Sequence, residues 1–161
     1  MATVGSAARS RHVMRKVGIP MLLLLTLPMA MPPAQAHKGA HGVIKERMKE
    51  MTRMEKSLRP INAMLKGKRP FDAEAVHEQG RRILRHAERI PQLFPQGSLK
   101  PPSEASPGIW QNFDDFRHRA DELKRAALLL MEASAATLPD VARQVQATCK
   151  GCHEKYRIEK D

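Results

Sequence analysis

The sequence predicts an all-α protein, an antiparallel four-helix bundle with one long crossover loop. Apolar residues recur at steps of three and four along four segments, which is the period of a helix buried on one face. Aromatic residues make up only 4% of the chain, while the helix-favouring residues Ala, Leu, Arg, Glu and Met are abundant. No segment shows the sustained alternation of a strand. Two short links and one long link between the segments suit a bundle.

The first 36 residues are predicted to be a cleaved secretory signal peptide. Residues 1–16 include four basic residues and no acid. A Leu-rich apolar run follows, and the segment ends in the small-residue pattern Ala34-Gln35-Ala36. Pro20 and Pro28 leave the apolar run shorter than the ~20 residues that a membrane-spanning helix needs. We therefore expect residues 37–161 to form the mature domain, exported to the periplasm and without a membrane span.

The net charge of +11 changes once the leader is set aside. Four of the 28 Lys and Arg residues lie in the leader and none of the 17 Asp and Glu, so the mature domain carries +7. An exported protein meets no genome, and we expect no nucleic-acid partner. Residues 45–69 hold nine Lys or Arg against three Glu, which favours docking to an acidic partner protein.

The first two helical segments cover about 41–66 and 72–90. Pro60 lies inside the first segment and is expected to kink or split that helix near Leu58. Asp72 is a good N-cap for the second segment. Gly80 interrupts the stripe of the second segment and predicts a close approach, either of another helix or of a cofactor.

A proline-rich connection separates these helices from the other two. Residues 91–108 contain five prolines and are predicted to be the crossover loop. The third segment starts at Ser106-Pro107, and its stripe runs from Ile109 to Ser134. The fourth follows Leu138-Pro139-Asp140 and carries the most informative motif of the chain.

That motif is Cys149-Lys150-Gly151-Cys152-His153. Cys-x-x-Cys-His is the attachment signature of c-type haem. On a helix the two thiols are at i and i+3 and the imidazole is at i+4, so all three project from one face. We therefore predict one covalent haem c, held by Cys149 and Cys152, with His153 as an axial ligand of the iron.

Three other interpretations of the motif agree less well with the rest of the chain. A thioredoxin-type redox pair needs a βαβ context, which the sequence lacks. A zinc site needs further ligands at metal spacing, whereas His77, His86 and His118 occur singly. A plain Cys149–Cys152 disulfide would make the chain a haem-free interaction module, and it would leave His153 unexplained.

This motif and the residues around it make the chain resemble the class II cytochromes c, the cytochrome c-prime family. The ending Cys149-x-x-Cys152-His153-x-x-Tyr156-Arg157 is typical of that family. Further similar stretches are Lys66-Gly67-x-x-Pro70-Phe71-Asp72, Phe94-Pro95-x-Gly97-Ser98 and Ile109-Trp110-x-x-Phe113-x-x-Phe116. The resemblance covers nearly all of the mature domain and implies a haem near the C-terminus of a four-helix bundle.

The resemblance also bears on the second axial position. The family's first helix carries an Arg with the distal residue four positions later, and here that pair is Arg47 and Met51. A Met there implies the low-spin branch, with His153 and Met51 as axial ligands. Met48 and Met54 are rival ligands, and Met51 as core filler is the remaining alternative. The resemblance also makes Arg47 and Arg157 candidate haem neighbours.

The function expected from these features is electron transfer by an exported monohaem cytochrome, a monomer or homodimer that is not an enzyme. Ligation by both His and Met closes the iron and suits single-electron transfer to redox partner proteins. The alternative is a five-coordinate cytochrome c-prime that binds NO or CO.

Overall fold

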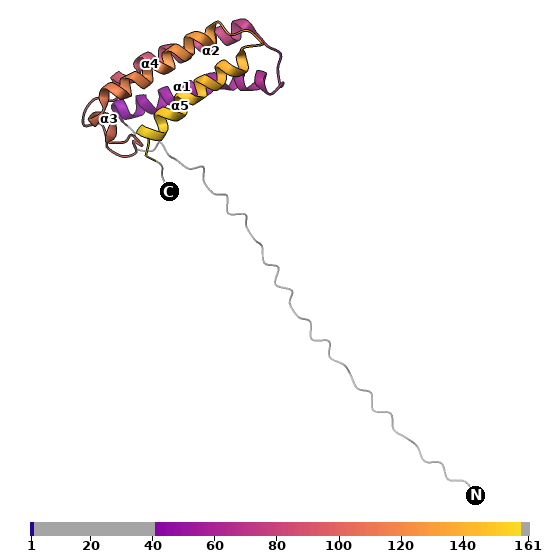
Figure 1. Cartoon of the computed structure of the whole chain (residues 1–161). Coiled ribbons are helices and arrows are strands. Elements are labelled where there is room, and N and C mark those ends of the chain that lie inside the picture. The colour runs from indigo at the N-terminus through magenta and orange to yellow at the C-terminus, as the bar shows by residue number, and fades with distance from the viewer. Residues whose placement is uncertain (2–40, 159–161) are drawn as a thin grey trace. The chain divides into compact units, whose positions relative to one another are not determined.

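Four long helices and two short helical turns make up the described part of this computed structural model, which comprises Met1 and residues 41–158. They are α1 (Gly42–Leu65), α2 (Ala73–Arg89), the 3-10 turn η1 (Pro91–Leu93), α3 (Gly108–Gln111), α4 (Phe113–Met131) and α5 (Leu138–Tyr156) (Figure 1). No strand occurs among these residues, so the predicted all-α class is confirmed. Within the same residues, no helix is long and apolar enough to cross a bilayer. Beyond Met1, the predicted leader lies outside the described part.

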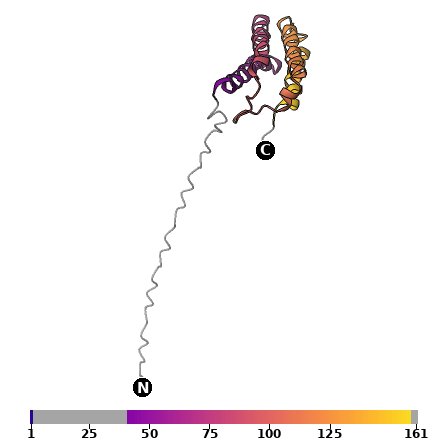
Figure 2. The same cartoon turned by 90° about the vertical axis from the view of Figure 1, so that its left-hand side faces the viewer.

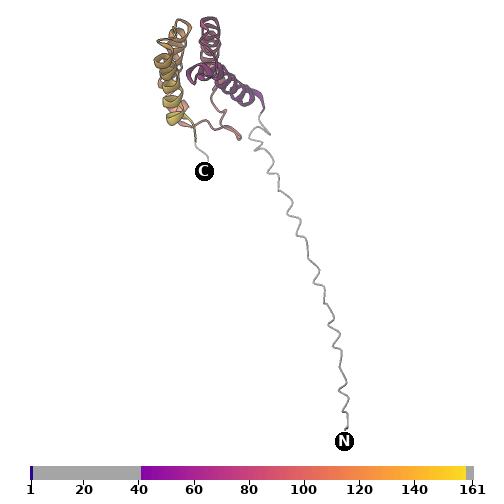
Figure 3. The same cartoon turned by 90° about the vertical axis from the view of Figure 1, so that its right-hand side faces the viewer.

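The long helices do not pack equally against one another. Helix α2 lies along α4, α4 along α5 and α1 along α2, whereas α1 and α5 meet over a short stretch only. Figures 2 and 3, seen from opposite sides, show the N-terminal half of α1 leaning away from α4 and α5. Direct helix packing therefore leaves the spacing of α1 and α5 weakly defined on this side of the bundle.

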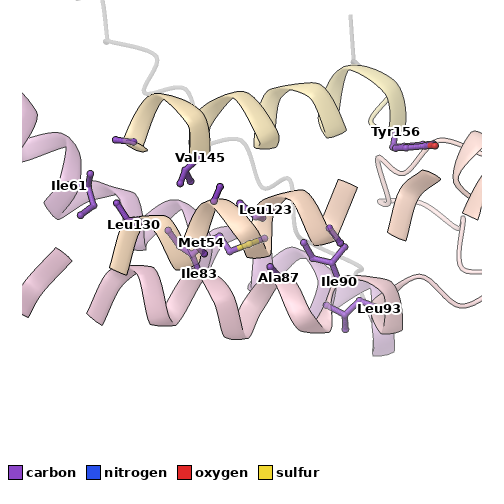
Figure 4. Packing of buried hydrophobic residues seen from close by; sticks show 14 of the residues in the cluster. Met54, Ile61, Ile83, Ala87, Ile90, Leu93, Leu123, Leu130, Val145 and Tyr156 are labelled. Atoms are coloured by element: carbon purple, nitrogen blue, oxygen red, sulfur yellow. The ribbon is translucent and has the colours of Figure 1, made fainter. Parts of the chain in front are cut away.

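The core is built from the inward stripes that the periodicity predicts. On α2, Val76 and Ile83 are at most 2% exposed, and Leu130 of α4 and Val145 of α5 are fully buried. Figure 4 shows such side chains converging between the helices, with Ile61 contributed by α1. Burial of each large apolar side chain contributes about 1.5–3 kcal/mol, which is what holds the helices together.

Helix α1 runs unbroken through Pro60. A proline inside a helix lacks the N–H that would bond to the carbonyl four residues earlier. Here that carbonyl belongs to Lys56, an exposed residue. Of the predicted kink or split near Leu58, the split is wrong, because the helix continues to Leu65.

The third predicted segment is divided at Asn112. Helix α3 ends at Gln111 and α4 begins at Phe113, because Asn112 has φ −134° and ψ 49°, outside the helical region. The Asn112 amide donates to the carbonyl of Gly108 (3.1 Å), and its own carbonyl accepts from Phe116 N (3.0 Å). The single helix from Ile109 onward is therefore corrected to a short turn followed by a long helix, which ends at Met131 rather than Ser134.

At Gly80, helices α2 and α4 approach each other closely. A Cβ at this position would lie 2.7 Å from Met131 Cγ, 2.9 Å from Met131 N and 3.0 Å from the carbonyl oxygen of Ala127. Two of these atoms belong to the backbone and cannot swing aside. The sequence predicted that either a helix or a cofactor approaches Gly80, and in the structure helix α4 does so.

A buried carboxylate joins α1 to α2. Glu50 is completely buried, and its Oε1 accepts hydrogen bonds of 2.5 Å from Arg53 and from Arg89. The Nδ1 atom of His86 lies against the other oxygen, Oε2, which has no further hydrogen-bond partner among the described residues. A buried carboxylate is tolerated only when it is paired in this way. This cluster explains why a charged residue occupies the inward face of α1.

Candidate functional site

The last two turns of α5 carry the Cys-x-x-Cys-His motif. The helical backbone places Cys149, Cys152 and His153 on one face, as the spacing predicts. The two thiols are half-buried and form no disulfide. His153 is more exposed to solvent than the two cysteines. The residues that the sequence singled out are thus gathered at one end of α5.

Two cavities meet at this end of α5. The first has a volume of about 160 Å³ and the second about 210 Å³. Met51, Cys152 and His153 line both of them. Aromatic side chains border the first cavity, and apolar side chains of α1 and α4 border the second. The structure therefore brings the first and last helices together at one hollow site.

The three methionines of this part of α1 differ in what they line. Met48 borders the first cavity only, and Met54 borders the second only. Met54 is also 8% exposed and belongs to the core. Met51 is half-buried and borders both cavities. Of the three thioethers, that of Met51 therefore lies between the two cavities, with His153.

The electrostatic surroundings keep the motif's side chains neutral. Burial raises the pKa of the Cys149 thiol and raises the pKa of Cys152 to about 11. Both are therefore protonated thiols at neutral pH. Burial of part of the ring, and secondly the positive charge of Arg157, lower the pKa of His153. The imidazole thus has a free nitrogen lone pair at neutral pH, as a metal ligand requires.

Arg47 is buried beside the first cavity and is bound to the crossover loop. All five of its N–H groups are used: they donate to Leu93 O (3.2 and 2.9 Å), Ser98 O (3.4 Å), Ser98 Oγ (2.8 Å) and Ser103 Oγ (2.7 Å). The guanidinium also lies over the ring of Phe94, 3.9 Å from its centroid. Burial lowers the pKa of Arg47 to about 10, so it remains a cation at neutral pH.

Arg157 also borders the first cavity. It pairs with Glu104 of the crossover loop, whose Oε2 accepts from Arg157 Nε (2.9 Å) and Nη2 (2.8 Å). Both predicted haem neighbours, Arg47 and Arg157, thus line the cavity while they hold the crossover loop. The loop contacts were not visible in the sequence, because the partners lie 46 to 56 residues away.

A second cluster at the end of α5 was also missed. The hydroxyl of Tyr156 donates to Asp115 Oδ2 (2.6 Å), and Lys155 Nζ (3.0 Å) and Arg119 Nε (3.2 Å) lie on the same oxygen. These contacts, that of Tyr156 first, lower the pKa of Asp115 to about 2. Burial, and then Asp115, raise the pKa of Tyr156 to about 12. Only the i, i+4 spacing of Asp115 and Arg119 was a signal.

Trp110 lines neither cavity. Trp110 donates its indole N–H to the carbonyl of Phe94 (3.1 Å), and it is Phe94 and Phe116 that line the first cavity. The described residues contain no cluster of three or more His, Cys, Asp or Glu side chains that could hold a metal ion. The histidines other than His153 are not gathered with the motif in this part of the chain.

Comparisons with known proteins identify the family. The family model described as Cytochrome C' matches residues 42–157. The chain belongs to this family, the class II cytochromes c. Cytochrome c-556 of Agrobacterium tumefaciens is 35% identical over 122 residues, which cover 74% of this chain and 99% of that protein. Cytochrome c-554 of Cereibacter sphaeroides is 35% identical over 147 residues, which cover 86% and 96%.

The solved structure of cytochrome c' from Rhodopseudomonas palustris superposes with a TM-score of 0.71. It is 30% identical in sequence and covers 76% of this chain and all of that one. This relationship confirms the four-helix bundle. As a class II cytochrome c, the protein binds one covalent haem c and is not an enzyme.

The residues around the two cavities fit a haem c group. Cys149 and Cys152 offer two unpaired thiols on one helix face, and His153 offers a neutral imidazole beside them. Phe94, Phe116 and other apolar side chains provide walls for a flat, mostly apolar ring system. An imidazole nitrogen such as that of His153 is a common ligand of haem iron.

Proposed function

We propose that this class II cytochrome transfers single electrons, with His153 and Met51 as the axial ligands of its haem iron. The observation that carries the proposal is the position of Met51, the one methionine of the described residues that borders both cavities together with His153. When bound, haem c supplies an iron that cycles between the ferric and ferrous states and so carries one electron.

The two cysteines hold the group covalently. Each cysteine would be joined to haem c by a thioether; addition of the S–H across a vinyl double bond would place the sulfur on one carbon and the hydrogen on the other, and would need no oxidant. Burial raises the pKa of both thiols, which keeps them protonated at neutral pH, and the two form no disulfide in the structure. The short Cys-x-x-Cys spacing on α5 then restricts how the group can sit relative to His153.

His153 and Met51 donate a nitrogen and a sulfur lone pair from opposite ends of the chain. Neither needs to lose a proton at neutral pH, because the pKa of His153 is lowered and a thioether has no proton to lose. Two neutral ligands that stay in place in both oxidation states keep reorganisation small. This favours electron transfer over the binding of gases.

We further propose that the partner is an acidic redox protein. The three acidic residues of 45–69 are Glu46, Glu50 and Glu55, and each of them pairs with a basic residue of α1. The bases therefore remain in excess on this helix, and an acidic surface would be attracted to it. Electron-transfer rates that fall as ionic strength rises are the expected result, and rates independent of salt would exclude this docking mode.

The site of action that we propose is the periplasm, reached by cleavage of the leader after Ala36. The basic start, apolar run and Ala34-Gln35-Ala36 ending support this. Mass spectrometry of the protein expressed with its own leader in a Gram-negative host provides the test. A periplasmic product beginning at His37 is expected, and a product that retains the leader would exclude cleavage.

Absorption spectra of the purified holoprotein test the ligation. Low-spin bands in both oxidation states, a weak far-red band from the ferric iron–sulfur pair, and slow or weak CO binding to the ferrous protein are expected. A high-spin spectrum with immediate, tight CO binding would instead assign the alternative, a five-coordinate gas-binding cytochrome c'. Haem staining after denaturing electrophoresis tests the covalent attachment itself.

A further inference from the structure

The crossover loop bridges the two helices that carry the candidate axial ligands. We call residues 93–106 the strap. At its first end, Arg47 of α1 donates to Leu93, Ser98 and Ser103 over 2.7–3.4 Å. Arg47 lies one helical turn before Met51, so the two side chains share a face of α1. The strap is therefore fixed to the turn of α1 from which Met51 projects.

The other end of the strap is fixed to the end of α5. Glu104 accepts two bonds from Arg157, at 2.9 and 2.8 Å. The backbones are joined as well, since Ile158 N donates to Glu104 O (2.8 Å) and Ser106 N donates to Tyr156 O (2.9 Å). Arg157 lies one turn after His153, and its own amide donates to the His153 carbonyl (3.0 Å). The strap thus holds the segment that carries His153.

The two anchors meet at adjacent residues of the strap. Ser103 accepts from Arg47, and Glu104 pairs with Arg157, so two side-chain links joined by the Ser103–Glu104 peptide connect α1 to α5. All four of these residues line the first cavity, beside Met51 and His153. The direct interface between α1 and α5 is short, and α1 leans away from α5 there (Figures 2 and 3).

We propose that Ser103 and Glu104 are positioning residues, which set the separation of Met51 from His153 by tying Arg47 to Arg157. The proposal rests on the ligation stated under Proposed function and adds to it what keeps the sixth position closed. Neither residue contributes an iron ligand. They act on the helices: removal of either side-chain link lets α1 move away from α5, and the pairing of Met51 with His153 weakens.

The experiment compares Ser103→Ala and Glu104→Gln with the wild-type holoprotein. Apparent CO affinity of the ferrous protein and the high-spin fraction of the ferric spectrum are measured. Each variant is expected to bind CO about two- to fivefold more tightly, because each substitution removes or weakens one partly exposed polar link. Ser103→Thr keeps the hydroxyl and should restore the wild-type values.

Asp140→Asn is the matched control, because it removes a carboxylate from an exposed pair with Arg143 that lines neither cavity. If the wild type is low-spin and both strap variants match this control, the positioning role is excluded while the ligation stands. A high-spin wild type excludes the ligation itself, and the positioning role with it. If one of the two strap variants fails to incorporate haem, hydrogen exchange of residues 42–51 in the other strap variant and in the Asp140→Asn holoprotein decides: faster exchange in the strap variant alone supports the positioning role, and equal exchange excludes it.

Discussion

The hydroxyl of Tyr156 lies 2.6 Å from Oδ2 of Asp115 and donates a hydrogen bond to it. The bond joins the end of α5 to the first turn of α4, three residues beyond His153. Lys155 and Arg119 reach the same carboxylate, so one oxygen gathers three donors from two helices. The cluster closes the bundle on the side of α5 that faces α4.

Asp115 is expected to make the bundle sensitive to acid. Its pKa is about 2 in the folded protein against an ordinary 3.8, so the unfolded chain takes up the proton first as pH falls. The contribution to stability is present above about pH 4 and is lost as pH falls from 3.8 to about 2. Denaturant midpoints of Asp115→Asn should lie below those of the wild type at pH 6 and converge with them at pH 2. The neighbouring Asp114→Asn is the control, because Asp114 is fully exposed, and a gap that persists at pH 2 would contradict the assignment.

Replacement of Met51 by Ala should open the sixth position. The ferric spectrum should become high-spin and the ferrous protein should bind CO readily, since Met48 and Met54 each border only one cavity. Met48→Ala and Met54→Ala are the matched variants and should stay low-spin. Met54→Ala should lower the free energy of unfolding by about 2–5 kcal/mol, because it empties a core position. If Met48→Ala or Met54→Ala is high-spin and Met51→Ala stays low-spin, the sixth ligand is the methionine replaced in the high-spin variant.

Gly80→Ala should destabilise the bundle although alanine is the better helix former. The added Cβ would meet Met131 and the Ala127 carbonyl at 2.7–3.0 Å, which forces α2 and α4 apart. Overpacking of this kind costs about 1–3 kcal/mol, more than the ~1 kcal/mol gained in helix propensity. Urea unfolding measures the difference. Gly108→Ala is the control, since its Cβ meets only the end of the Ser106 side chain, at 3.3 Å.

Arg47→Lys should loosen the start of the strap. Lysine keeps the charge but offers three donors at one point in place of five in a planar fork, so Leu93 O and Ser98 cannot both be satisfied. A decrease of about 2 kcal/mol in the free energy of unfolding is expected, from the buried carbonyl left without a donor. Urea unfolding of Arg47→Lys beside Lys45→Arg, an exposed change on the same helix, gives the comparison. Equal midpoints would show that the five bonds do not contribute.

Local sequence patterns predicted the helices well and their long-range contacts poorly. The N-cap of α2 is where the sequence placed it, with Asp72 accepting from Ala75 N at 2.9 Å, because capping depends on four neighbouring residues. The split predicted near Leu58 does not occur, because the one hydrogen bond that Pro60 removes is not enough to end the helix. The break at Asn112 involves the Tyr156 hydroxyl, 3.4 Å from its carbonyl and 44 residues away.

In the functional site too, the local motif could be predicted and the long-range contacts could not. Cys149, Cys152 and His153 are one short motif whose helical spacing could be predicted. Ser103 and Glu104 carried no signal, since a serine and a glutamate in a proline-rich loop are ordinary surface residues until Arg47 and Arg157 are placed beside them. The sequence names donors and acceptors, whereas their pairing depends on the folded arrangement of distant segments.

The position of α5 at the end of the chain orders the maturation of the protein. Synthesis proceeds from the N-terminus, so α1, α2 and α4 emerge before the thiols of Cys149 and Cys152 exist. The two cysteines and His153 are therefore synthesised after the parts of α1 and α4 that border the same cavities. A chain that stops before Leu138 would contain α1, α2 and α4 but neither cysteine nor His153, so it could not attach haem covalently.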